Sequence, residues 1–263
     1  MNALRGILAT LLSLVAEPDL SHVAVAFDHV IESFRNQLYA GYKTGDGVDP
    51  DLLAQFHPAE RATAALGIVA WPMVEFEADD ALAAAAFRWR DAPGVEQVVI
   101  CSPDKDLSQC VVGTRVICRD RRRAIDRDAA GVVARFGVAP ESIPDWLALV
   151  GDSADGYPGI PGWGEKSAAA VLARHLHVEA IPDEPSRWGV DVRGRDRLAA
   201  ALRERRDEAL LYKRLATLRT DVPLAEELAD LEWRGARRAE LEPLCREIGA
   251  PELLERVRRW RAA

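Results

Sequence analysis

The sequence predicts an α/β fold, in which a mostly parallel sheet is flanked by helices and followed by a helical C-terminal part. Short, continuous apolar runs at 22–27, 97–101 and 114–118 are typical of buried parallel strands. Helical patterns lie between the first two runs, and only helical patterns follow the third. Asp28 and Asp104 follow the first two runs, and the C-terminal ends of parallel strands are where functional residues of such sheets gather.

Helices are expected between and after these runs. In chain order they span about residues 59–66, 79–90, 126–135, 144–150, 165–174 and 196–218. Apolar residues at helical spacing from Leu4 to Val15 also predict a core helix at the N-terminus, for which a short signal peptide is the alternative. The tail over 237–261 is expected to form one or two amphipathic helices that break near Gly249 and Pro251.

Two segments lack a regular apolar pattern. Residues 34–60 are polar and contain several glycines and prolines, so we expect a loop or a mobile helical segment there. Residues 178–195 are rich in proline, glycine and charge, and are expected to form an exposed connection.

The composition restricts the class of protein. A chain of 263 residues with 49% hydrophobic and 29% charged residues is typical of a soluble globular protein. The net charge of −8 argues against a generally basic surface, but not against nucleic acid as a partner, because carboxylates at a metal site would account for much of it. Four cysteines without CxxC spacing predict neither zinc nor disulfides, and they indicate a reducing compartment, the cytoplasm. No apolar run reaches the length of a membrane span.

Acidic residues are the most informative feature of the chain. Four groups of them occur, formed by Asp28; by Glu77, Asp79 and Asp80; by Asp104 and Asp106; and by Asp152 and Asp155. Like charges within a few Å repel strongly, so a fold that gathers these carboxylates requires cations. Mg²⁺ and Mn²⁺ prefer carboxylate and water oxygens, and a pair of such ions is expected. Each group alone has an alternative as a helix cap or a turn. Asp120 lies in a basic run, and we expect its role to differ from that of the four acidic groups.

A glycine-rich turn follows the last acidic group. It reads Gly159-Ile-Pro-Gly162-Trp-Gly164-Glu-Lys166 and opens a helix with a lysine in its first turn. Backbone N–H groups at such a turn bind phosphate, whereas an ordinary glycine-rich start of a helix is the alternative. The carboxylates and this turn together point to hydrolysis of nucleic-acid phosphodiesters.

With these motifs in this order, the chain resembles the 5′-nuclease family: the 5′→3′ exonuclease domain of bacterial DNA polymerase I, stand-alone 5′→3′ exonucleases and flap endonucleases. The resemblance covers about residues 1–225. The matching stretches are Phe27-Asp28, Ser33-Phe-Arg35, Gly41-Tyr-Lys43, Glu77-Ala-Asp-Asp80, Asp104-Lys-Asp-Leu107 with Gln109, and Gly151-Asp-Ser-Ala-Asp155 with Pro158-Gly-Ile-Pro-Gly-Trp-Gly-Glu-Lys166. It implies a PIN-like α/β nuclease domain over 1–140, a helix–hairpin–helix DNA-binding subdomain over 141–225 and a helical tail over 226–263.

The resemblance implies a metal-dependent 5′→3′ exonuclease and flap endonuclease that cleaves DNA by a two-metal mechanism, in replication and repair. The implied ligands of one Mg²⁺ cluster, direct or through water, are Asp28, Glu77, Asp79, Asp104 and Asp106. The implied ligands of the second metal, or residues that support them, are Asp80, Asp152 and Asp155. Lys43 looks like the lysine that contacts the scissile phosphate, and Arg35 like a nearby phosphate contact. Surface solvation is the alternative for both.

The resemblance also implies how DNA is held. The turn at Gly159, Gly162 and Gly164 looks like the helix–hairpin–helix element, which grips duplex phosphates, often with a K⁺ on its carbonyls, and Lys166 adds charge. Arg119 and the run that contains Arg121, Arg122 and Arg123 would contact the DNA backbone, with a solvated loop as the alternative. We expect a monomer that binds duplex DNA with a 5′ end, flap or nick.

The sequence departs from the family at its start. Family members begin with a buried strand that ends in Asp, and this segment is absent before the helix at Met1. Either the start lies upstream, or the chain is a catalytically impaired relative that binds branched DNA without cutting it. A small PIN-like ribonuclease is a third hypothesis, against which the 159–166 turn argues.

Overall fold

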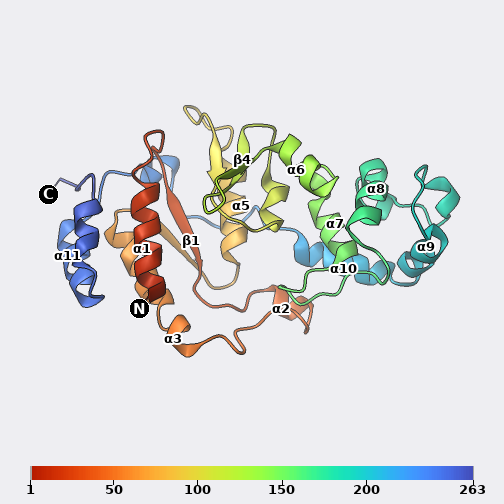
Figure 1. Ribbon diagram of the computed structural model, residues 1–263, viewed down its shortest axis with the longest axis horizontal. Helices are drawn as coiled ribbons and strands as arrows, with labels where there is room; N and C mark the ends of the chain where they lie inside the picture. The colour runs from red at the N-terminus through yellow and green to blue at the C-terminus, as the bar shows by residue number, and fades with distance from the viewer. Residues whose placement is uncertain (1, 263) are drawn as a thin grey trace. The chain divides into compact units, whose positions relative to one another are not determined.

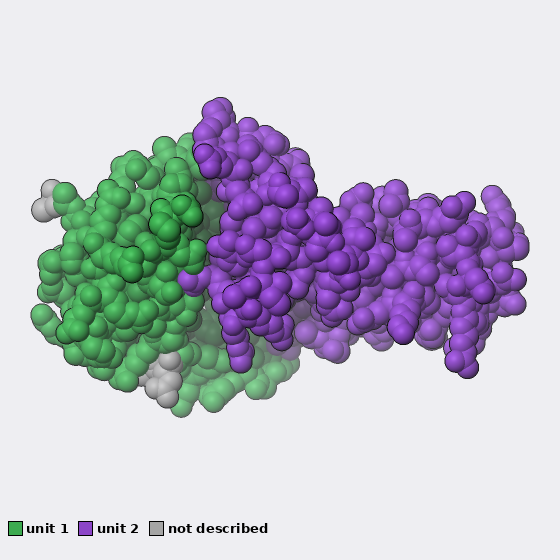
Figure 2. Space-filling view, turned by 45° about the horizontal axis from the view of Figure 1, so that its top comes forward, with its two compact units in different colours: residues 1–33, 45–81, 223–263 green, residues 34–44, 82–222 purple. Residues whose placement is uncertain are grey.

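The computed structural model describes residues 2–262, so Met1 lies outside the described part of the chain. The chain divides into two compact units (Figure 2). Unit 1 comprises residues 1–33, 45–81 and 223–263, and unit 2 comprises residues 34–44 and 82–222. Each unit combines segments that are distant in sequence. The nuclease domain over 1–140, the DNA-binding subdomain over 141–225 and the helical tail over 226–263 stay predictions, because the division into compact units does not test them.

Unit 1 is built around a short parallel sheet. Strands β1 (Ala24–Asp28) and β2 (Val69–Met73) pair in parallel, with Ala24 opposite Val69 and Asp28 opposite Met73. The helices of unit 1 are α1 (Asn2–Leu14), α3 (Pro50–Leu53), α4 (Phe56–Ala65), the first turn of α5 (Ala78–Trp89) and α11 (Arg238–Glu247), followed by a 3-10 helix at Pro251–Arg256 (Figure 1).

The core of unit 1 joins the two ends of the chain. Helix α1 buries Leu4, Leu8, Leu11 and Leu12, and Val15 is buried directly after it, which confirms the prediction of a core helix. These side chains share one hydrophobic cluster with residues of α4 and α11. The cluster removes apolar surface from water, which is the main stabilising contribution to such a unit.

Unit 2 contains a second sheet and most of the helices. Strand β4 (Val116–Asp120) lies between β3 (Val98–Ile100), to which it is parallel, and β5 (Ile125–Arg127), to which it is antiparallel. The helices are α2 (Arg35–Leu38), the rest of α5, α6 (Ala129–Phe136), α7 (Ile143–Val150), α8 (Glu165–His175), α9 (Arg195–Glu204) and α10 (Arg206–Ala216). Helix α7 is almost entirely buried, and α8 and α10 pack against it.

The predicted α/β class and the three predicted strands are confirmed, but two elements were not expected. Strand β2 includes Pro72, whose ring usually argues against a strand because it has no N–H to donate. Strand β5 occupies the start of the segment predicted as a helix over 126–135. Helix α6 begins only at Ala129, where the Asp128 side chain caps it by accepting from the Gly131 N–H at 2.8 Å.

Two further predictions were wrong in detail. The single helix expected over 196–218 is divided into α9 and α10 at Arg205, whose φ of −120° and ψ of 29° are not helical. The connection over 178–195 is only partly exposed, because Val178, Ile181 and Trp188 are buried in the core of unit 2. Periodicity did not reveal this burial, since Val178 lies in a short 3-10 helix and Ile181 and Trp188 each directly follow one. Among residues 2–262, no helix combines the length and apolar character that a membrane crossing requires.

Candidate metal-binding site

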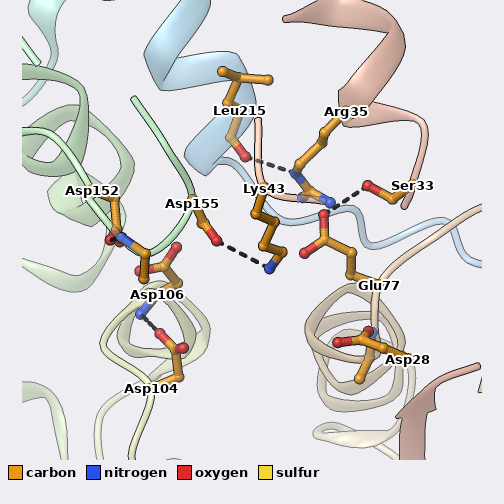
Figure 3. A network of polar contacts seen from close by, with 12 residues as sticks. Asp28, Ser33, Arg35, Lys43, Glu77, Asp104, Asp106, Asp152, Asp155 and Leu215 are labelled. Atoms are coloured by element: carbon orange, nitrogen blue, oxygen red, sulfur yellow. Dashed lines mark hydrogen bonds and ion pairs between the residues drawn. The ribbon is translucent and has the colours of Figure 1, made fainter. Parts of the chain in front are cut away.

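Unit 1 places its predicted metal ligands at the end of β1 and the start of α5. Asp28 Oδ1 accepts a hydrogen bond of 2.7 Å from the backbone N–H of Ala78, the first residue of α5. Glu77 is buried, and its Oε1 accepts from the Ser33 hydroxyl at 2.8 Å (Figure 3). Both carboxylates lie at the positive end of the α5 dipole, which stabilises their charge.

The two aspartates within α5 differ in their surroundings. Asp80 is fully buried, and its Oδ2 accepts from the Glu77 backbone N–H at 3.0 Å. This bond is half of a capping box, so Asp80 caps the helix from a buried position rather than from a solvated one, and its role at a metal stays a prediction. Asp79 is half-buried in the same turn.

Unit 2 brings three carboxylates together. Oxygen atoms of Asp106, Asp152 and Asp155 all lie within 4.8 Å of one another, and Figure 3 shows the three side chains converging. Oxygens that bind one Mg²⁺ at 2.0–2.1 Å lie about 2.9 Å apart when adjacent and about 4.2 Å apart when opposite. The three oxygens are thus close to the spacing of ligands around a single divalent ion.

Asp106 has the side-chain environment that best fits a cation. Its side chain is buried, and among residues 2–262 no group donates a hydrogen bond to its Oδ1. Burial raises the pKa of Asp106 well above its usual value, and the charges of Asp104 and Asp155 raise it further. Lys105 Nζ, 3.8 Å from Oδ1, only partly offsets these effects. A buried carboxylate oxygen without a donor fits a divalent ion, which supplies positive charge and a ligand bond together.

Asp104 supports the backbone beneath this cluster. Its Oδ1 accepts from the Asp106 N–H at 2.9 Å, and its own N–H donates to the Ser102 hydroxyl at 3.1 Å. These bonds fix the turn that follows β3, and Asp104 keeps its second oxygen for other contacts. In unit 2, Asp104 therefore orients Asp106.

Two lysines accompany the cluster. Lys43 Nζ lies 3.0 Å from Asp155 Oδ1, and a dashed line marks this ion pair in Figure 3. Lys105 Nζ pairs with Asp152 Oδ2, and Asp152 Oδ1 accepts from the Ala154 N–H at 3.0 Å. No role for Lys105 was predicted from the sequence. Its position between Asp104 and Asp106 was a signal, because a positive charge between two negative ones is suited to an ion pair near the cluster.

Arg35 has a different environment from the one the resemblance implied. The side chain is 1% exposed. Its Nε donates to the Leu215 carbonyl at 2.8 Å, and an Nη donates to the Thr217 carbonyl at 3.2 Å, at the end of α10. Arginine commonly satisfies the last carbonyls of a helix in this way. The described contacts of Arg35 indicate that it anchors the end of α10. None of these contacts supports the predicted contact of Arg35 with phosphate.

The glycine-rich turn is packed tightly between α7 and α8. Gly159 has a φ of +71°, and a Cβ there would lie 2.4 Å from the Gly151 nitrogen. Gly164 caps α8, with Ser167 Oγ accepting from its N–H at 3.0 Å. Gly162 and Lys166 are exposed. The Lys166 charge is therefore accessible at the start of α8, where a helix N-terminus favours an anion.

Trp163 holds this turn in place. Its indole N–H donates to the Leu198 carbonyl of α9 at 3.1 Å, and its ring centroid lies 5.5 Å from that of Trp188. Sequence reasoning had not singled out this tryptophan, because an aromatic residue in a glycine-rich loop gives no separate signal.

The basic run lies at the tip of the β4–β5 hairpin. Arg122 is exposed, and Arg121 is half-buried. Arg119 pairs with Asp126 across the hairpin at 2.6 Å, and Arg123 Nη1 lies 3.5 Å from Asp120. The structural role of Asp120 agrees with the expectation that it differs from the other acidic groups.

A cavity of about 520 Å³ lies beside the unit 2 carboxylates. Asp104 and Asp152 contribute to its wall. The basic residues that line it are Lys105, Arg123, Arg127 and Arg135. Of these four, only Arg123 belongs to the predicted basic run. Basic side chains around a cavity attract a polyanion. Metal ions bound by the adjacent carboxylates would neutralise the charge of its phosphate.

Comparison with known proteins gives a consistent result. Residues 1–137 match the family described as 5′-3′ exonuclease, N-terminal resolvase-like domain, and residues 138–239 match the one described as 5′-3′ exonuclease, C-terminal SAM fold. DNA polymerase I of Pseudomonas aeruginosa is 35% identical over 257 residues, which cover 94% of this chain and 27% of that protein. Flap endonuclease Xni of Edwardsiella ictaluri is 36% identical over 234 residues, 86% of this chain and 87% of that protein. The chain thus spans about a quarter of the length of the polymerase relative.

Solved structures share the fold. A mutant of T5 5′-exonuclease has a TM-score of 0.66 at 16% identity, covering 96% of this chain and 92% of that one. A bacteriophage T5 flap endonuclease, described as a pseudo-enzyme-product complex with DNA and metal ions, has a TM-score of 0.65 at 17% identity, covering 96% and 91%. The catalytic core of Rad2 in complex with DNA substrate has a TM-score of 0.59 at 15% identity, covering 97% and 83%.

Proposed function

The chain belongs to the 5′-3′ exonuclease family, and from this premise we propose that it hydrolyses DNA phosphodiester bonds as a metal-dependent 5′→3′ exonuclease and 5′-flap endonuclease. The resemblance predicted from the motifs is thereby confirmed. DNA as the substrate is supported by the complexes of the T5 and Rad2 proteins, and a divalent metal by the metal ions described for the T5 enzymes.

One observation carries the proposal. In unit 2, Asp106, Asp152 and Asp155 converge within 4.8 Å, and a buried oxygen of Asp106 accepts no hydrogen bond. An isolated carboxylate in that position is unfavourable because it loses its hydration. We therefore assign Asp106, Asp152 and Asp155 to a metal ion, with Asp104 as the residue that orients Asp106.

The remaining predicted ligands belong to the same proposal. Asp28, Glu77 and Asp79 lie at the end of β1 and the start of α5, and we assign them to a second ion, with Asp80 as the cap that fixes their helix. When bound, divalent ions stabilise negative charge on a phosphate and lower the pKa of a water molecule. Mg²⁺ is our candidate because the ligands are carboxylate oxygens, with Mn²⁺ as its substitute.

Two lysine side chains next to the carboxylate cluster position the substrate. Lys43 and Lys105 each pair with a carboxylate of the cluster, and both are partly exposed. An incoming phosphate competes for these ammonium groups, because its charge is more accessible than that of the buried aspartates. We propose that Lys43 contacts the scissile phosphate, and that Lys105 shifts between Asp152 and the DNA backbone.

We further propose that the turn between α7 and α8 binds duplex DNA as a helix–hairpin–helix element. The exposed Gly162, the α8 N-terminus and Lys166 are suited to phosphate contacts that read no sequence. A K⁺ ion on the carbonyls of this turn is part of the same proposal, as are contacts of Arg121 and Arg122 with the backbone. A monomer in the cytoplasm is proposed as well, and the lack of CxxC spacing among the four cysteines is in keeping with a reducing compartment.

The test is cleavage of a 5′-labelled flap duplex in Mg²⁺, with and without EDTA. Asp106→Asn is expected to reduce the rate by more than about 10- to 100-fold, the loss that residues merely supporting a metal ligand produce. Asp196→Asn is the matched control, because Asp196 on α9 is 87% exposed. It is expected to cut like the unmodified protein.

Other outcomes separate the remaining hypotheses. Tight, salt-sensitive binding of the flap without any Mg²⁺-dependent product would overturn the nuclease proposal in favour of a DNA-binding relative. Faster cleavage of single-stranded RNA than of flap DNA would favour the small ribonuclease. Equal rates for Asp106→Asn and Asp196→Asn would contradict the assignment of the metal site.

A further inference from the structure

A second group of potential metal ligands lies in unit 1, apart from the residues assigned to the nuclease site. Imidazole nitrogens of His29 and His57 and a carboxylate oxygen of Glu60 all lie within 4.8 Å of one another. His29 follows the last residue of β1, while His57 and Glu60 are three residues apart in the first half of α4. No zinc signal is evident in the sequence at these residues, because His29 is distant along the chain from His57 and Glu60.

The elements that carry the three residues are well anchored. The His29 backbone N–H donates to the Met73 carbonyl at 3.0 Å, which continues the pairing of β1 with β2. Helix α4 buries Ala59, Ala62, Thr63 and Ala65. Residues at i and i+3 lie on one face of a helix, so His57 and Glu60 project together toward His29. The ligand set is thus positioned by the fold before any ion binds.

The spacing agrees with a tetrahedral metal ion. Both imidazoles face the same carboxylate oxygen, because Glu60 Oε2 lies 3.1 Å from His29 Nδ1 and 3.7 Å from His57 Nδ1. Ligand atoms at 2.0–2.2 Å from a tetrahedral Zn²⁺ are about 3.3–3.6 Å apart. The two distances lie on either side of this range, so small side-chain adjustments are sufficient to place the three atoms around one ion.

The chemistry of the ligands distinguishes this group from the carboxylate cluster. Imidazole suits Zn²⁺ and other late transition metals, whereas carboxylate and water suit Mg²⁺. Two histidines and one glutamate are a known zinc ligand set that leaves a fourth position for water. The side chain of His57 is 62% exposed and that of Glu60 is 13% exposed, so an ion reaches the site from solvent and binds a partly desolvated carboxylate.

We propose that His29, His57 and Glu60 form a Zn²⁺-binding site that joins the end of β1 to α4. The alternative is a simple hydrogen bond between His29 and Glu60, with the His57 ring tilted against the His29 ring at a centroid distance of 4.4 Å. An ion that binds only the folded state shifts the folding equilibrium toward that state. Zn²⁺ therefore stabilises unit 1 and restrains α4, independently of the nuclease site.

Histidine NMR tests the site directly, because the chain has five histidines. Zn²⁺ is titrated near neutral pH into the Asp106→Asn protein, in which the carboxylate cluster is weakened as a competing site. The ring resonances of His29 and His57 are expected to shift together at one equivalent, while those of His22, His175 and His177 stay unchanged. Shifts of all five rings, or of none, overturn the proposal.

Calorimetry with matched variants supplies a second test. His57→Ala is expected to weaken Zn²⁺ binding by at least about 10- to 100-fold and to abolish the rise in melting temperature that Zn²⁺ causes. Glu60→Gln is expected to do the same, and His22→Ala, at an exposed position of unit 1, serves as the control. Equal Zn²⁺ affinities for His57→Ala and His22→Ala contradict the site.

The two proposals fail separately. Mg²⁺-dependent cleavage of flap DNA by His57→Ala is expected to equal that of the unmodified protein, because His57 belongs to no part of the nuclease site. A Zn²⁺ site without nuclease activity would leave the inference standing and overturn the proposed function.

Discussion

Gly156 lies directly against the backbone of Gly41. A Cβ atom at position 156 would be 2.2 Å from the Gly41 carbonyl oxygen, and Gly156 has a φ of +87°. Next to this contact, the Lys43 backbone N–H donates to the Asp155 carbonyl at 3.0 Å, and Lys43 Nζ reaches the Asp155 carboxylate. A glycine thus permits the approach that brings Lys43 to the carboxylate cluster.

Gly156→Ala is expected to lower both stability and activity. The methyl group meets a backbone atom that cannot rotate away, and the left-handed conformation adds strain of about 1–3 kcal/mol. The free energy of unfolding should fall by at least that amount, and the cleavage rate should fall because Lys43 is displaced. Gly94→Ala is the control, since Gly94 has a φ of +83° with no atom near the added Cβ. Equal losses in both variants would show that strain alone, not the contact with Gly41, matters.

Asp106→Asn is expected to stabilise the metal-free protein while it removes activity. The pKa of Asp106 is raised in the folded state, mainly by burial, so the folded state binds this proton more tightly than the unfolded state does. The contribution of Asp106 to stability is therefore present at low pH and is lost as pH rises from about 3.9 through the raised pKa. Denaturant titrations in metal-free buffer should show a smaller loss with pH for Asp106→Asn. An unchanged pH profile would contradict the burial argument.

Asp145→Ala is expected to destabilise unit 2 strongly. Asp145, fully buried in α7, accepts from the Val178 N–H at 2.8 Å and pairs with Lys213 of α10 at 2.9 Å. Its removal leaves a buried N–H unsatisfied and, among residues 2–262, leaves Glu179 as the remaining acidic partner of Lys213, at a cost of about 3–5 kcal/mol. Glu242→Ala, at a surface pair of α11, should cost about 0–1 kcal/mol. Similar midpoints of urea unfolding for both variants would argue against a structural role for Asp145.

Lys166→Ala is expected to weaken DNA binding with little effect on stability. Lys166 is exposed in the first turn of α8, so its loss removes about one phosphate contact and lowers the slope of log affinity against log salt by about 1. Fluorescence anisotropy with an uncleavable flap at several salt concentrations measures both quantities. Arg246→Ala, exposed on α11, should leave the slope unchanged. If the two variants behaved alike, the turn would not be the duplex-binding element.

Local patterns predicted the elements better than their boundaries. Continuous apolar runs identified β1, β3 and β4, and the α1 periodicity identified its buried face. The break at Arg205 between α9 and α10 was missed, because both halves have helical patterns and only packing decides where the chain turns. Strand β2 was missed because Pro72 disfavours a strand, a preference that pairing with β1 overrides.

The sequence by itself determined the family and the set of carboxylates, because the order and spacing of acidic groups and glycines are properties of the chain. The tertiary structure decided what each group contacts, since contacts between distant segments depend on packing that no local pattern encodes. It alone buries an oxygen of Asp106 without a donor, directs Lys105 to Asp152 and fixes Arg35 to the end of α10. It also brings His29 to His57 and Glu60, which are 28 and 31 positions away but adjacent in unit 1.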